Sequence, residues 1–300
     1  MLEPSNEDHV KSAIKLIMIA GFMMVIGGYA DAWWHVHIGR DDFWIPPHLV
    51  IYSTFTTIVA LFSYLLFRGN LGREKWGAVI GIFMMLTALP IDNWWHATHP
   101  PEVGLDLMSA PHVYFALGGA MTGLSIMNSV AKKARNDYEL RKYLFIYILA
   151  GYLMSMQAIG LLDPSNPTII GYFGSALFPS VPVGFYIFTR KFYNSSYVVI
   201  LALSGGIAKT LLEGNPSYML SIVSSGLFLA TFKHLRSSNS WFLIYGAVMG
   251  IILSSYLLFF ISSLSFETLA FRYIIGVLTA ASIGILVNYE SKIFMKTFRW

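Results

Sequence analysis

Residues 12–34 of the chain read SAIKLIMIAGFMMVIGGYADAWW, and this stretch decides the fold class. Its only charged residues are Lys15 near the start and Asp31 near the end. A helix needs roughly 20 consecutive apolar residues to cross the ~30 Å hydrocarbon core of a bilayer. A signal peptide would also be apolar, but no small-residue cleavage site follows this stretch, so we interpret it as a retained helix. The stretch therefore predicts a membrane-spanning helix.

Apolar runs of similar length recur along the rest of the 300 residues. The chain is 56% hydrophobic and 12% charged, with a mean hydropathy of +0.60, whereas soluble domains carry about a quarter of their residues as charges. Lipid offers no hydrogen-bond partner for an open strand, so the spans should be helices. We therefore predict an all-α, polytopic transmembrane helical bundle of about ten spans, with the further runs at 47–67, 76–95, 111–130, 143–162, 169–189, 195–212, 217–233, 241–262 and 268–289.

The basic residues predict how the chain is oriented in the membrane. Of the 20 Lys and Arg residues, 17 lie at the two termini or in alternate connections. The remaining connections hold only Arg40, with Lys209 and Arg272 near the ends of runs. This positive-inside pattern places both termini in the cytoplasm. It also accounts for the net charge of +4, so we expect no nucleic-acid partner.

Six of the eight histidines lie in two similar stretches. Residues 31–48 read DAWWHVHIGRDDFWIPPH, and residues 92–112 read DNWWHATHPPEVGLDLMSAPH. Both contain Asp-x-Trp-Trp-His, then a connection with glycine and acidic residues, then Pro-His at the start of the next run. Such self-similarity indicates a duplicated helical hairpin.

The spacing of these residues is typical of metal ligands. Asp31 and His35 are four apart, so they share one face of a helix, and a short antiparallel connection brings His48 back beside them. Two imidazoles and a carboxylate suit Cu(II), Zn(II) or non-haem Fe(II), and a chain without cysteine offers no thiolate ligand. The sequence thus predicts two metal sites near the non-cytoplasmic face, with the ligands Asp31, His35 and His48 in one and Asp92, His96 and His112 in the other.

Other polar and aromatic residues of the two stretches have simpler interpretations. The tryptophans at 33, 34, 44, 94 and 95 are typical of an interfacial aromatic belt. His37 and His99 are expected in the connections or beside the ligands. The acidic residues Asp41, Asp42, Glu102 and Asp106 are expected in a solvated loop, and His9 and His234 have no predicted role.

The first stretch resembles a known family, the copper membrane monooxygenases that include the particulate methane and ammonia monooxygenases. Asp31-x3-His35-x12-His48, within RDDFWIPPHLVIYS, is similar to the ligand motif in one membrane subunit of these enzymes, and especially to the archaeal ammonia-oxidising branch. The resemblance covers roughly residues 15–130. It implies that the first set holds one copper and that Asp92, His96 and His112 form a second, adjacent site. This chain has Asp92 where the family has asparagine, and its second connection is longer.

The resemblance implies a function as the membrane subunit of a copper-dependent monooxygenase. Such a protein would oxidise ammonia, methane or a short hydrocarbon, and a small apolar or neutral substrate would reach the sites through the bilayer. It would need other membrane subunits and an electron donor such as a quinol. Zinc or non-haem iron would change this chemistry.

Two other functions remain open from the residues themselves. A non-enzymatic membrane protein that acquires, senses or transfers copper or zinc would use the same ligands. A haem-b electron carrier would need facing histidines, and acidic residues at i−4 fit a mononuclear metal site better.

The charged linker 131–142 is the expected boundary between two halves. Residues 1–131 form a predicted metal-binding four-helix half that contains the duplicated hairpin. Residues 140–300 form a predicted six-helix half of unassigned role, in which frequent small residues indicate close helix packing.

Overall fold

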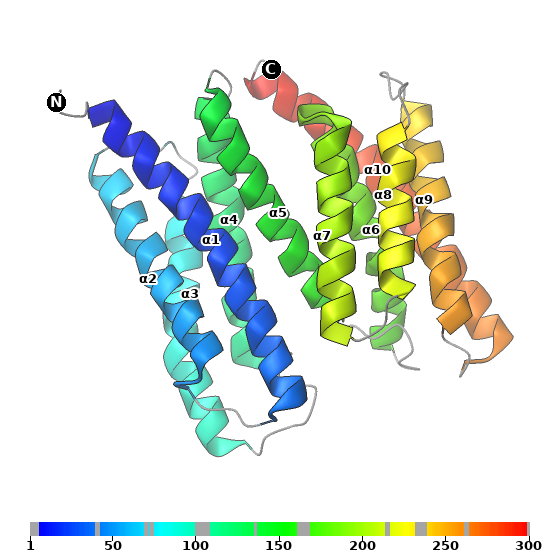
Figure 1. Cartoon of the computed structure of the whole chain (residues 1–300), viewed down its shortest axis with the longest axis horizontal. Helices are drawn as coiled ribbons and strands as arrows, with labels where there is room; N and C mark the ends of the chain where they lie inside the picture. The colour runs from blue at the N-terminus through cyan, green and yellow to red at the C-terminus, as the bar shows by residue number, and fades with distance from the viewer. Residues whose placement is uncertain are drawn as a thin grey trace. The chain divides into compact units, whose positions relative to one another are not determined.

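The computed structural model describes residues 6–39, 43–68, 72, 75–99, 109–134, 137–160, 169–213, 217–231, 239–260 and 264–298. All the regular structure in these residues is α-helical, which confirms the all-α part of the predicted fold class. Each predicted apolar run coincides with one helix (Figure 1). The helices are α1 (Asn6–His37), α2 (Pro46–Phe67), α3 (Lys75–Thr98), α4 (Ala110–Ala134), α5 (Tyr138–Gly160), α6 (Ile169–Phe192), α7 (Ser195–Glu213), α8 (Ser217–Thr231), α9 (Asn239–Phe260) and α10 (Phe266–Phe298).

Five of these helices are long and apolar enough to cross a membrane. They are α1 to α4 and α10, with spans at Glu7–His35, Pro46–Phe67, Lys75–Trp95, Ala110–Val130 and Phe266–Tyr289. Helices α7, α8 and α9 contain shorter apolar stretches. The five spans identify an integral membrane protein, whereas the full count of about ten spans and the cytoplasmic position of both termini stay predictions.

The chain forms two compact units, Met1–Gly151 and Tyr152–Trp300, which divide inside α5. The sequence predicted a metal-binding half at 1–131 and a half of unassigned role at 140–300. Division into compact units says nothing about metal binding, so these two roles stay predictions.

The first unit is built from two antiparallel hairpins, α1/α2 and α3/α4, and the start of α5 (Figure 1). The hairpins touch where the rings of Phe55 and Phe115 meet edge to face at 5.9 Å. Tyr147 of α5 packs against Gly21 of α1 and Gly123 of α4. Helix α5 therefore contacts one helix of each hairpin.

The described basic residues of this unit gather at one end. They lie where α1, α3 and α5 begin and where α2 and α4 end (Figure 1), at Lys11, Lys15, Arg68, Lys75, Lys133, Arg141 and Lys142. Lys15 pairs with Glu139, and Lys11 lies 3.4 Å from Asp137. The Leu140 backbone N–H donates to Asp137 Oδ1 at 3.1 Å and, with Lys11, holds the pKa of that carboxyl below its usual value. Asp137 therefore caps the start of α5.

The second unit also contains close helix contacts at small residues. A methyl group on Gly246 or Gly284 would meet backbone atoms of the facing helix at 2.5 Å, so α9 and α10 are in backbone contact. In α6, which contains Pro179 and Pro182, the buried Tyr186 hydroxyl lies 3.0 Å from that of Tyr152. Lys209 is buried.

Candidate metal centre

The first candidate site forms where α1 ends and α2 begins. Asp31 and His35 lie on one face of the last turns of α1, as their spacing of four predicts. Pro46 and Pro47 occupy the first positions of α2, where a missing N–H costs nothing. This early start places His48 in the first turn of α2, directly after the connection, so the third side chain returns to the same end of the hairpin.

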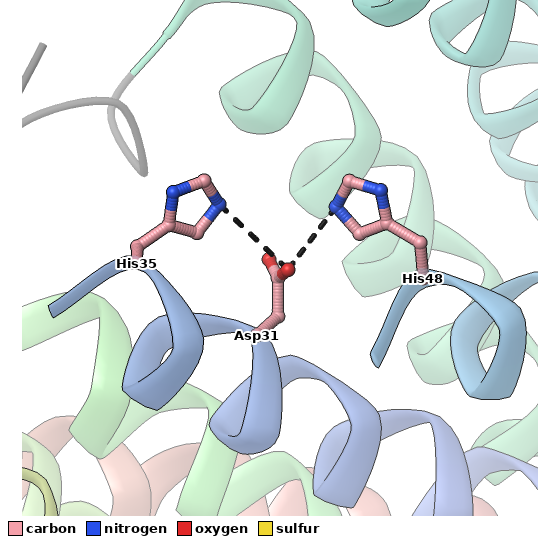
Figure 2. A group of neighbouring side chains, drawn as sticks. All are labelled: Asp31, His35 and His48. Carbon is pink, nitrogen blue, oxygen red and sulfur yellow. Dashed lines mark ion pairs between the residues drawn. The ribbon is translucent and has the colours of Figure 1, made fainter. Parts of the chain in front are cut away.

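The three side chains converge (Figure 2). Asp31 Oδ1 lies 3.1 Å from His48 Nε2 and 3.7 Å from His35 Nε2. In Figure 2 the two imidazoles approach the carboxylate from either side. The three ligand atoms lie within 4.8 Å of one another, and all three residues are buried. Metal–ligand bonds of ~2.0–2.2 Å are reached by small side-chain rotations from this arrangement.

The buried Asp31 carboxylate points to a cation between these ligands. Among the described residues, Oδ1 accepts no hydrogen bond, and its polar contacts are the two imidazole nitrogens. Burying an ionised carboxylate is costly unless a positive group pairs with it. A protonated imidazole or a metal ion would supply that charge, so the donor set fits a metal.

His48 is held in the orientation that a ligand needs. Its Nδ1 lies 3.3 Å from the Phe43 carbonyl oxygen, which only accepts hydrogen bonds. In the neutral imidazole, Nδ1 then carries the proton and the lone pair of Nε2 faces Asp31. Metal-ligating histidines commonly donate their other N–H in this way.

The second hairpin repeats part of this geometry. His112 Nε2 lies 3.2 Å from Asp92 Oδ1, almost the same distance as in the first hairpin. The Ser109 hydroxyl lies 3.0 Å from His112 Nδ1 and accepts from the His112 backbone N–H at 3.5 Å, so it also caps α4. His96 lies in α3, but its side chain is outside the described residues. The structure thus brings together two of the three predicted residues.

The other described histidines of the two stretches, His37 and His99, make local contacts with a tryptophan of the preceding helical turn. His37 is exposed and stacks on Trp33 at 4.7 Å, and His99 stacks on Trp95 at 3.8 Å. Each places its Nδ1 near the backbone carbonyl of that tryptophan, at 2.9 Å and 3.2 Å. His9 is exposed on α1, and the expected loop residues Asp41, Asp42, Glu102 and Asp106 lie outside the described residues, as does His234.

Three of the five tryptophans expected in an aromatic belt are exposed, and the belt itself stays a prediction. Trp33, Trp44 and Trp94 are exposed large rings near the ends of α1 and α3 and the start of α2. Rings of this kind anchor a helix end at the membrane interface.

Sequence reasoning missed two groups that support the histidines. The Phe43 carbonyl is a backbone atom, which no residue pattern identifies. Ser109 offered a signal, because a serine just before a helix start is typical of an N-cap, but its contact with His112 depends on the local turn.

Comparisons with protein-family models, with curated proteins and with solved structures found no match.

Proposed function

We propose that the chain is the membrane subunit of a copper-dependent monooxygenase that oxidises a small apolar or neutral substrate. The buried group of Asp31, His35 and His48 carries this proposal. Two nitrogens and one oxygen leave coordination positions open for a reactant, and imidazole-rich sites bind copper tightly.

The residues of the site have separate tasks in this proposal. His35 and His48 supply neutral nitrogen ligands, and Asp31 neutralises part of the metal charge in a buried place. The Phe43 carbonyl keeps the His48 lone pair directed at the site. Burial excludes water, which strengthens each electrostatic contact.

Bound copper would supply the activation of oxygen. In the overall reaction one atom of O₂ goes to the substrate. The other leaves as water, with two electrons and two protons from a donor such as a quinol. The chain has no cysteine to hold an iron–sulfur cluster, so the electrons are proposed to come from a partner. Ammonia, methane or a short hydrocarbon is the proposed substrate class.

Asp92 and His112, with His96, are proposed to hold a second metal. The distance of 3.2 Å between Asp92 and His112 supports this role. Their side chains are 10% and 18% exposed, against 7% and 3% for Asp31 and His48. The more open pair is proposed to exchange its metal faster.

A second candidate function is the capture and transfer of copper or zinc without catalysis. One observation favours it. In the first unit the paired Asp and His side chains all lie at one end, and the described Lys and Arg residues lie at the other. This arrangement allows metal uptake from one side without a path across the membrane. An enzyme and a capture protein differ in turnover, not in ligands.

The test is the metal content of the detergent-purified full chain, with paramagnetic resonance of any Cu(II). One or two coppers per chain with a nitrogen-rich type-2 signal, and oxygen uptake with ammonia or a small hydrocarbon when a quinol is supplied, would support the monooxygenase. Copper without turnover, even with membrane extract added, would support capture. No copper after reconstitution would exclude both roles for copper.

A further inference from the structure

A close approach of α1 and α2 lies one turn from the candidate metal ligands. Gly27 precedes Asp31 by four residues on α1, and Ile51 follows His48 by three on α2. A methyl group built on Gly27 would lie 2.9 Å from Ile51 Cγ1 and 3.3 Å from the Ile51 backbone nitrogen. It would also lie 3.2 Å from Val50 Cγ1. The two helices therefore touch at a position where only hydrogen fits.

The residues opposite Gly27 cannot easily move aside. Ile51 and Val50 are β-branched, and a β-branched side chain in a helix has one strongly preferred rotamer. Carbon atoms pack best at ~3.5–4.0 Å, so a methyl group at 2.9 Å requires an opening of about 1 Å. The closest of these contacts is to Ile51 Cγ1, which is bonded directly to Cβ and cannot swing away. Helix α2 must therefore shift unless the Ile51 side chain is shortened.

A shift of that size matters at the ligands. His48 belongs to the same first turns of α2 as Val50 and Ile51, and its Nε2 lies 3.1 Å from Asp31 Oδ1. Metal sites tolerate errors of only about 0.2 Å in their ligand distances. A wider hairpin would leave Asp31 and His35 together on α1 and would withdraw the third ligand.

We infer that Gly27 is a positioning residue for the metal centre: its missing side chain sets the distance between α1 and α2 at which His48 joins Asp31 and His35. The inference rests on the proposed function only in taking a metal as the ligand of this group. It assigns no contact between Gly27 and the metal.

The chain offers a matched control. A methyl group on Gly119 of α4 would have Met85 Cε as its nearest neighbour, at 3.9 Å, an ordinary contact. Gly119→Ala therefore changes glycine to alanine in a helix of the same unit without pushing helices apart.

The experiment measures Cu(II) affinity and the paramagnetic resonance spectrum of the full chain. We expect Gly27→Ala to weaken copper binding by at least about 10-fold, the loss seen when groups that orient metal ligands are removed. The nitrogen couplings should decrease, because one imidazole is withdrawn. Gly27→Ala/Ile51→Ala should recover most of the affinity, and Gly119→Ala should match the wild type.

If Gly27 only stabilised the fold, Ile51→Ala would not restore copper affinity, because truncating a packed isoleucine leaves a gap and lowers stability. If Gly27→Ala binds copper with wild-type affinity and spectrum, the inference is wrong. If Gly27→Ala does not fold, Ile51→Phe enlarges the other side of the same contact and should show the same loss. Wild-type affinity in that variant would equally overturn the inference.

A readout without metal separates this inference from the proposed function. The chain contains no cysteine, so Asp31→Cys/His48→Cys introduces the only two thiols. Cross-linking by a short bifunctional thiol reagent should be efficient, should fall after Gly27→Ala and should return with Ile51→Ala. If the wild type binds no copper but this pattern holds, the function is wrong and the positioning role stands. An unchanged cross-linking yield would overturn the positioning role.

Discussion

The two hairpins of the first unit carry the same motif but hold it differently. In α1/α2 the Asp31–His48 pair lies one turn from the helix contact at Gly27, on a helix without an internal proline. In α3/α4 a close backbone contact lies between Gly81 and Gly118, about three turns from Asp92, and Pro90 lies inside α3 just before Asp92. The distance from the histidine Nε2 to the aspartate Oδ1 is thus nearly the same in the two hairpins, 3.1 Å and 3.2 Å, although the helices that carry these residues pack differently.

The difference shows that ligand spacing and ligand environment are separate properties. Spacing brings an imidazole to a carboxylate in both hairpins. Burial is tighter in the first, where the Asp31 and His48 side chains are 7% and 3% exposed. We therefore expect the first site to hold metal more tightly than the second.

The largest expected effect is the loss of one site at a time. His48→Ala should abolish tight copper binding in the first hairpin, because the remaining Asp31 and His35 come from one helix only. His112→Ala should remove only a weaker second copper. Metal analysis after dialysis checks both variants, with retention in the membrane fraction as the control. Equal copper content in His48→Ala and the wild type would contradict the assignment of the ligands.

A smaller effect is expected at the contact of the second hairpin. A methyl group on Gly81 would overlap the Gly118 carbonyl oxygen and would lie 2.8 Å from the Thr122 nitrogen. Overpacking of this kind typically costs about 1–3 kcal/mol, so Gly81→Ala should lower the Tm in detergent. It should leave the first copper in place, since that site depends on α1 and α2. Loss of the first copper in this variant would show that the two hairpins are not independent.

A still smaller effect is expected when the group beside the His112 Nδ1 is removed. Ser109→Ala removes the hydroxyl beside His112 Nδ1 and should weaken metal binding at the second site by about tenfold. The first site should not change, because its corresponding partner is the Phe43 backbone carbonyl. Competition titrations with a chelator measure the two affinities. A change at the first site instead would contradict this comparison.

The smallest effect concerns α5, which contacts both hairpins. Asp137→Ala removes the cap at the start of α5 and should cost about 1 kcal/mol of stability. Because the folded state lowers the pKa of Asp137 below 3.8, this contribution is full above pH 3.8 and is lost as the pH falls through the lower, folded-state pKa. Thermal melts of the wild type and of Asp137→Ala at several pH values check this. A stability difference that persists in strong acid would mean that the charge of Asp137 is not the cause.

The sequence by itself determined the helices and the candidate ligands. Apolar runs of membrane-spanning length marked each helix to within a few residues, except at the ends of α1 and α10, which extend further. The spacing of four between Asp31 and His35 fixed their common face, because the period of a helix is local. The Pro-His pair marked where α2 and α4 begin.

Only the tertiary structure decided how the ligands are supported. Glycines are frequent in this chain, and nothing in the sequence distinguishes Gly27 from Gly119. Their difference lies in what faces them across another helix, at 2.9 Å in one case and 3.9 Å in the other. The same holds for the Phe43 carbonyl and the Ser109 hydroxyl, which meet a histidine only after the connection has folded. Helix period follows from neighbours in the sequence, whereas helix separation depends on residues far apart in the sequence.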